Sequence, residues 1–192
     1  VVGFAEIFAQ HGALVHVMDS FWRDEPGPLA IPEEASSAMA RMRNLNPEDA
    51  YSDLLAVIDT GLKDAHCTGE LFLLGICFGG KFVMRATQER PVKGLAVWHG
   101  AGLLPWVSTP ALQQTQSSLD FGAADPLIPI TEIETLREML PCKTQHEIRV
   151  HPHAGHGFSH TGTVKHVAPA ADAAAAARKA ARKERKGSSS KE

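Results

Sequence analysis

The amino-acid sequence predicts an α/β fold in which helices flank a mostly parallel β-sheet. Short apolar segments that suit buried strands alternate with segments of helical periodicity, as in strand–helix–strand units. The clearest example is residues 71–83, LFLLGICFGGKFV, where an apolar run meets a glycine-rich corner and then a helix-compatible segment. Since 44% of the 192 residues are hydrophobic, the chain can build one domain with a substantial core.

The first 70 residues are expected to form two helices and one strand. The stretch GFAEIFAQHG, residues 3–12, has three apolar side chains on one helical face and a terminal glycine that ends the helix. Ala13–Met18 is predicted to be a short strand, and Glu25–Pro32 a proline-rich surface loop. A second helix is predicted from Pro47 to about Ala65, because a proline followed by two acids suits a first helical turn.

The remaining chain supplies the strands of the predicted sheet. Four segments have the required apolar or alternating pattern: Leu71–Leu74, Gly94–Trp98, a segment that Gln113–Asp120 leads into, and His146–Val150. Two helices are predicted, Lys81–Glu89 and Thr131–Leu140. Thr131 is expected to cap the second helix, with Glu134 completing a capping box, and Pro141 to end it. Residues 101–115 are expected to be irregular.

The C-terminal end differs in composition from the rest of the chain. Residues 168–186 are rich in alanine, lysine and arginine and predict a helix that can bury little area, while residues 187–192 are expected to be disordered. The net charge of the chain is −3, but the stretch from Arg178 onward carries seven basic and two acidic residues. The body is therefore acidic, which argues against nucleic-acid binding.

Cys77 occupies the corner between the first apolar run and the helix that follows it. Glycines on both sides suit a tight turn, in which the central residue adopts a strained backbone conformation and neighbouring β-carbons have little room. A helix N-terminus favours the thiolate, which is the reactive form of cysteine. The alternative is that Cys77 is a small buried hydrophobic residue.

Two later loops carry side chains that can assist a thiol nucleophile. Asp125 stands in the loop FGAADPLIP after an apolar segment, and His156 stands in the loop HAGHGF after the alternating segment. A nucleophile, an acid and a histidine in this chain order, each just after a predicted strand, are typical of the α/β-hydrolase triad.

Together GICFGG, FGAADPLIP and HAGHGF closely resemble the dienelactone hydrolase (carboxymethylenebutenolidase) family of α/β-hydrolases, which use cysteine as the nucleophile. The separations of 48 residues between Cys77 and Asp125, and of 31 between Asp125 and His156, are also similar to those of the family. The resemblance extends over about residues 4–167. It implies a three-layer α/β/α hydrolase fold for residues 1–167, and hydrolysis of a carboxylic ester or lactone.

The resemblance also implies roles for single residues. Cys77 would attack the substrate carbonyl, His156 would transfer protons and Asp125 would orient its ring. The backbone N–H of Phe78 would donate to the oxyanion, and Arg23 would bind a substrate carboxylate. The family's second carboxylate-binding arginine lies four residues after the histidine, where this sequence has His160. That difference puts dienelactone itself in doubt as the substrate.

The resemblance further implies that the N-terminal strands of the fold are absent. In the family, a strand lies between those matching Ala13–Met18 and Leu71–Leu74, and the loop after it supplies a second oxyanion N–H and a glutamate that interacts with the resting cysteine. No segment of this sequence corresponds to it. We therefore expect a truncated chain, in which the strand before Cys77 is not paired on both sides.

The six histidines from His146 to His166 raise the alternative of a zinc site. No H-E-x-x-H helix and no clustered acid accompanies them, so most are expected to be surface residues, and no metal or other cofactor is predicted. Two other classes of protein stay open. Glutamine amidotransferases have a similar corner, but with Gln in place of Lys81 and an acid in place of Phe158. A catalytically inactive member of the hydrolase fold, with a binding role or none, is the second.

The three cysteines are too few and too scattered for a disulfide framework, which favours a reducing compartment. No apolar run approaches a membrane span, and the N-terminal residues do not resemble a signal peptide. We expect a cytoplasmic protein whose partner is a small-molecule ester or lactone, not a nucleic acid or a membrane. The sequence indicates no oligomeric state.

Overall fold

The computed structural model describes residues 2–29, 33–140 and 145–159. The chain divides into two compact units, an N-terminal unit that ends at Glu70 and a C-terminal unit that begins at Leu71. The helix predicted for residues 168–186 and the tail after it lie outside the described residues. No helix in the described ranges is both long enough and apolar enough to cross a membrane.

Three helices form the regular part of the N-terminal unit: α1 (Val2–Gln10), α2 (Ala35–Asn44) and α3 (Pro47–Leu62). The first predicted helix is confirmed, and Gly12 ends it with a φ of +86° and an N–H that donates to the Ala9 carbonyl. The helix beginning at Pro47 is confirmed too, capped by Asn46, whose side chain accepts from the Glu48 N–H at 3.0 Å. Helix α2 was not predicted from the sequence.

The predicted strand Ala13–Met18 is wrong, because these residues have no regular secondary structure. A strand needs a neighbour for its N–H and C=O groups, and within the described N-terminal unit no segment pairs with this one. The ring of His16 instead lies against the backbone of Gly61 in α3, where an added β-carbon would come within 3.1 Å of it. Apolar alternation alone therefore did not suffice to form a strand here.

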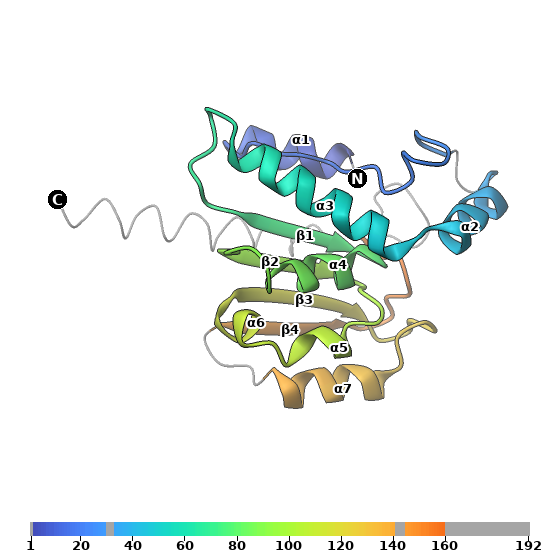
Figure 1. The fold of residues 1–192 in the computed structure, drawn as a ribbon. Coiled ribbons are helices and arrows are strands. Elements are labelled where there is room, and N and C mark those ends of the chain that lie inside the picture. The colour runs from blue at the N-terminus through green and yellow to red at the C-terminus, as the bar shows by residue number, and fades with distance from the viewer. Residues whose placement is uncertain (1, 30–32, 141–144, 160–192) are drawn as a thin grey trace. The chain divides into compact units, whose positions relative to one another are not determined.

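A parallel sheet organises the C-terminal unit (Figure 1). Its strands are β1 (Phe72–Ile76), β2 (Gly94–Trp98), β3 (Gln116–Gly122) and β4 (His146–His151), in that spatial order. This confirms the predicted α/β class and parallel sheet. Within the described ranges, β1 pairs with β2 alone. One register row, Gly75–Val97–Leu119–Ile148, crosses all four strands, and its three side chains are buried.

Helix α4 (Gly79–Ala86) packs against β1, and Phe82, Val83 and Met84 are among its buried residues. It follows β1 directly and ends three residues before the predicted Glu89. Because the connection is so short, the end of β1 and the start of α4 fix the backbone of the residues between them.

Two further sequence predictions in this unit are wrong. Residues 101–115 are not irregular but contain α5 (Leu104–Val107) and α6 (Pro110–Gln114), each with a proline in its first turn, which suits helix initiation. Helix α7 (Ile130–Met139) begins one residue before Thr131, so Thr131 lies inside the first turn and does not cap it. Pro129, extended at ψ 145°, takes the capping position without a side-chain hydrogen bond. Pro141 lies outside the described residues.

Candidate active site

The corner between β1 and α4 has the strained geometry that the sequence predicted. Cys77 adopts a φ of +53°, a region that non-glycine residues rarely occupy. A β-carbon on Gly75 would lie 2.5 Å from a methyl carbon of Val83, and one on Gly80 would lie 2.7 Å from Val97. Gly79, in contrast, has open space around it, so the expectation of crowding there is wrong.

Asp125 lies in the loop between β3 and α7, with its carboxylate fully enclosed. Oxygen Oδ1 accepts the Leu127 N–H at 2.9 Å, which fixes the orientation of the carboxylate. The same loop is joined to the chain after β4, because the Ala124 N–H donates to the Ala154 carbonyl at 2.9 Å. Gly122 permits this approach, since a β-carbon there would lie 2.3 Å from the Ala154 oxygen.

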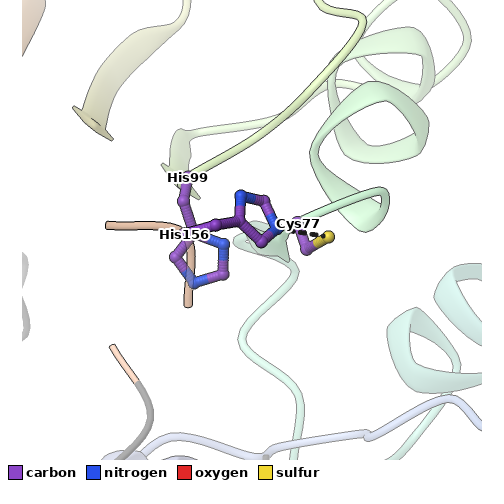
Figure 2. Close-up of side chains that lie close together, drawn as sticks. All are labelled: Cys77, His99 and His156. Carbon is purple, nitrogen blue, oxygen red and sulfur yellow. Dashed lines mark hydrogen bonds between the residues drawn. The ribbon is translucent and has the colours of Figure 1, made fainter. Parts of the chain in front are cut away.

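His156 comes from the loop after β4, and its ring lies between the other two predicted residues. Nitrogen Nε2 is 3.1 Å from the Cys77 Sγ, as the dashed line in Figure 2 marks. Nitrogen Nδ1 is 2.8 Å from the Asp125 Oδ2. The structure therefore brings together the three predicted triad residues in the order thiol, imidazole, carboxylate.

The surroundings of His156 favour its charged form. Its pKa is raised to about 9, chiefly by the hydrogen bond to Cys77, while partial burial opposes the shift and Asp125 adds to it. A charged His156 ring can donate a proton, and it lies 3.1 Å from the Cys77 sulfur. The pair can therefore present a nucleophile and a proton donor to the same substrate.

Phe78, the predicted oxyanion donor, directly follows Cys77 and precedes the first residue of α4. Its backbone is helical, with φ −60° and ψ −22°, so its N–H belongs to the helix N-terminus at the corner. Backbone N–H groups at such a position favour negative charge.

His99, which was not predicted from the sequence, also lies at this site. His99 follows β2 directly, is fully buried and has a φ of +39°. Its ring packs edge-on against the His156 ring with centroids 4.8 Å apart, and its Nε2 is 2.8 Å from the Ser159 Oγ. The position of His99 directly after a predicted strand was the available signal, because the carboxyl ends of neighbouring parallel strands meet at one edge of a sheet.

Two of the six histidines, most of which were expected on the surface, are buried, and His160 and His166 lie outside the described residues. His146 is buried, with its Nδ1 2.8 Å from the Ser117 Oγ, and burial lowers its pKa. His151 is buried as well, with its Nε2 2.8 Å from the enclosed carboxylate of Asp120. Both lie on β4, and side chains of the neighbouring strand β3 provide a hydrogen-bond partner for each.

Arg23 lies in the N-terminal unit and is occupied by an internal partner. Its Nε and Nη2 donate to the two carboxylate oxygens of Asp53 at 2.8 and 2.6 Å, while the Trp22 indole donates to the same carboxylate at 2.8 Å. The hydrogen bond from Arg23 is the main cause that lowers the Asp53 pKa. Arg23 and Arg41 line a hollow of about 280 Å³ within this unit. Substrate binding by Arg23 stays a prediction.

Comparisons with known proteins identify the family. The sequence profile of the Dienelactone hydrolase family matches residues 4–184. A Synechocystis protein provisionally named carboxymethylenebutenolidase is 30% identical over 131 residues, covering 60% of this chain and 53% of the relative. The carboxymethylenebutenolidase of Pseudomonas putida is 24% identical over 162 residues, covering 80% of this chain and 66% of the relative. The chain thus spans about half to two thirds of the length of these curated relatives.

Solved structures agree on the fold. A provisionally named dienelactone hydrolase from Klebsiella pneumoniae matches with a TM-score of 0.56 at 22% identity, covering 69% of this chain and 60% of that one. Esterase 2 of Thermogutta terrifontis matches with a TM-score of 0.50 at 14% identity, covering 66% of this chain and 59% of that one. Since the family profile matches most of the sequence, the chain belongs to the dienelactone hydrolase family of α/β-hydrolases.

Proposed function

We propose that this protein hydrolyses a carboxylic ester or lactone through a Cys77–His156–Asp125 triad. The observation that carries the proposal is the pair of hydrogen bonds that joins the three side chains, 3.1 Å from sulfur to Nε2 and 2.8 Å from Nδ1 to the carboxylate. Membership of the family supports the same reaction class.

In the first half of the reaction, the Cys77 sulfur attacks the carbonyl carbon and forms a tetrahedral intermediate. The Phe78 N–H donates to the oxygen that becomes negative. The bond from the carbonyl carbon to the alkoxy oxygen then breaks, and His156 gives its proton to the departing oxygen. An acyl group remains on sulfur as a thioester, and the alcohol leaves.

In the second half, His156 removes a proton from water as the water oxygen attacks the thioester carbon. The carbon–sulfur bond breaks, the carboxylic acid departs, and the proton on His156 restores the resting pair with Cys77. Asp125 keeps Nδ1 protonated throughout, so that Nε2 always faces the sulfur and the substrate.

We further propose that the substrate carries an anionic group bound by Arg23. A guanidinium fork that already holds a carboxylate bidentately, as it does with Asp53, has the geometry that a substrate carboxylate requires. Such binding requires exchange of Asp53 for the substrate. It predicts that Arg23→Lys raises KM for an anionic ester and leaves KM for a neutral ester unchanged.

The direct test is hydrolysis of p-nitrophenyl acetate by the wild-type protein and by Cys77→Ala. Loss of the nucleophile is expected to lower kcat at least about 1,000-fold. Cys67→Ala is the matched control, because Cys67 is also a free thiol but stands in none of the three motifs of the proposed triad. It should hydrolyse the ester at the wild-type rate.

Iodoacetamide supplies a second readout, with the modified cysteine located by peptide mass spectrometry. Selective alkylation of Cys77 together with loss of turnover is the expected result. Undiminished turnover by Cys77→Ala would exclude the mechanism. Absence of both turnover and selective alkylation would favour an inactive hydrolase-fold protein instead.

A further inference from the structure

Three side chains with soft or borderline ligand atoms converge at the carboxyl edge of the sheet (Figure 2). Cys77 follows β1, His99 follows β2 and His156 lies in the loop after β4. One ligand atom from each lies within 4.8 Å of the other two. Hydrolysis uses Cys77 and His156 but gives no role to His99, although His99 is fully buried against the His156 ring.

Each imidazole in this cluster also contacts a residue outside the cluster. His156 contacts Asp125 through Nδ1, so its Nε2 faces the thiol. His99 contacts the Ser159 hydroxyl through Nε2, and a proton on that nitrogen places the lone pair of the ring on Nδ1. Metal-binding histidines are held in this way, because the outer partner fixes both the tautomer and the ring direction.

The three ligand atoms lie within 4.8 Å of one another, and a tetrahedral ion would draw them closer together. Bonds of about 2.3 Å to sulfur and 2.0–2.1 Å to nitrogen place the ligand atoms of a tetrahedral zinc site about 3.3–3.6 Å apart. The Cys77 sulfur and the His156 Nε2 are 3.1 Å apart, so they need to separate by only about half an ångström. One thiolate and two imidazoles form a ligand set that favours Zn²⁺ over Mg²⁺ or Ca²⁺.

We propose that Cys77, His99 and His156 bind one Zn²⁺ ion, and that bound zinc holds the protein in an inactive form. On binding, bonds form from zinc to sulfur and to two nitrogens, and the proton shared by Cys77 and His156 leaves to solvent, without any change of oxidation state. The ion occupies both the nucleophile and the base. The inhibitory part rests on the proposed hydrolase function, whereas the binding part does not.

Zinc affinity is measured by competition with a chromogenic chelator, using ZnCl₂ and the full chain. His99→Asn removes the third ligand and keeps a residue type that tolerates positive φ. We expect its zinc affinity to fall by more than about 100-fold, the upper end of what loss of an outer partner costs. His153→Asn is the matched control, since His153 is an exposed histidine of the same loop as His156 with a φ of +61°. It should bind zinc like the wild type.

Cobalt provides a second readout that does not depend on turnover. CoCl₂ added to the wild-type protein should produce a thiolate-to-cobalt absorption band, and Cys77→Ser should abolish that band while keeping the local packing. If His99→Asn does not fold, as judged by its thermal unfolding, the presence of this absorption band in the wild type and its loss in Cys77→Ser provide the test. Zinc should also protect Cys77 from iodoacetamide.

The outcomes separate this inference from the hydrolase proposal. Zinc binding that requires Cys77 and His99, in a protein that hydrolyses no ester, supports the metal site and counts against the hydrolase. Ester hydrolysis that micromolar zinc does not inhibit overturns the inference and leaves the hydrolase standing. Equal zinc affinity in the wild type and His99→Asn, or a cobalt spectrum without the sulfur band, also overturns it.

Discussion

The role of Asp125 gives the sharpest test of the site, through the substitution Asp125→Asn. This change removes the negative charge but keeps the size of the side chain. The amide oxygen can still accept the Leu127 N–H, now 2.9 Å from Oδ1, so the loop should keep its course. The amide nitrogen would then face the His156 Nδ1 and displace its proton to Nε2. The neutral imidazole ring would therefore carry its hydrogen on Nε2, facing the sulfur.

The magnitude follows from burial and geometry. The Asp125 carboxylate is enclosed, and its 2.8 Å contact to His156 is a hydrogen bond between charged groups, worth about 1.5–3 kcal/mol. Because 1.36 kcal/mol corresponds to one pKa unit or one decade of rate, the His156 pKa should fall by about one to two units. The same energy lowers kcat/KM by about 10- to 150-fold.

The assay is p-nitrophenyl acetate hydrolysis across pH, together with NMR titration of the His156 ring. Asp64→Asn is the matched control, since Asp64 also contacts an imidazole, that of His66 at 3.0 Å, but in an exposed pair of the N-terminal unit. Its kcat/KM should stay within about twofold of wild type. An Asp125→Asn protein with unchanged kcat/KM, in which His156 still titrates near pH 9, would contradict this role of Asp125.

Two further predictions concern stability. The pKa of buried His146 lies below its unfolded value of about 6.5, so its contribution to the free energy of unfolding should be fully present above that pH. At lower pH the contribution should decline, because the unfolded chain binds a proton at His146 more readily than the folded protein does. Denaturant unfolding between pH 5 and 8 should show this slope, and His146→Gln should flatten it; an equal slope in both proteins would contradict the assignment. Gly75→Ala should lower the free energy of unfolding by about 1–3 kcal/mol, because the new β-carbon would lie 2.5 Å from Val83. Gly79→Ala, in open space at the start of α4, should leave that energy unchanged or raise it by up to about 1 kcal/mol, and equal losses in the two variants would rule out crowding as the cause.

The fold of the C-terminal unit was predictable because its signals are local. The strand Gly94–Trp98 was predicted with the bounds that the structure has, since glycine and an apolar run define it. The sharp turn at Cys77 was predicted from the glycines around it. At Gly75 and Gly80 the absence of a β-carbon does permit the close packing of neighbouring residues. The errors arose where a neighbour decides the outcome, as at Ala13–Met18, which has strand composition but no pairing partner among the described residues of its unit.

The site was only partly predictable for the same reason. Cys77, Asp125 and His156 were found because each stands in a recognisable motif after a strand. His99 was overlooked because its position directly after a strand is a weaker signal than a complete motif, although its ring packs on that of His156. The partner of Arg23 was also unforeseen, because Asp53 lies 30 residues away on another element.

Local sequence patterns specified the four strands of the C-terminal unit, the sharp turn at Cys77 and the three triad residues at the strand ends. Those features depend on residues a few positions apart, so composition and spacing suffice to specify them. The 3.1 Å contact between the sulfur and the imidazole across 79 residues, and the second imidazole packed beside them, appear only in the folded chain. Such contacts depend on the paths of several loops and on the register of neighbouring strands, which no local pattern encodes.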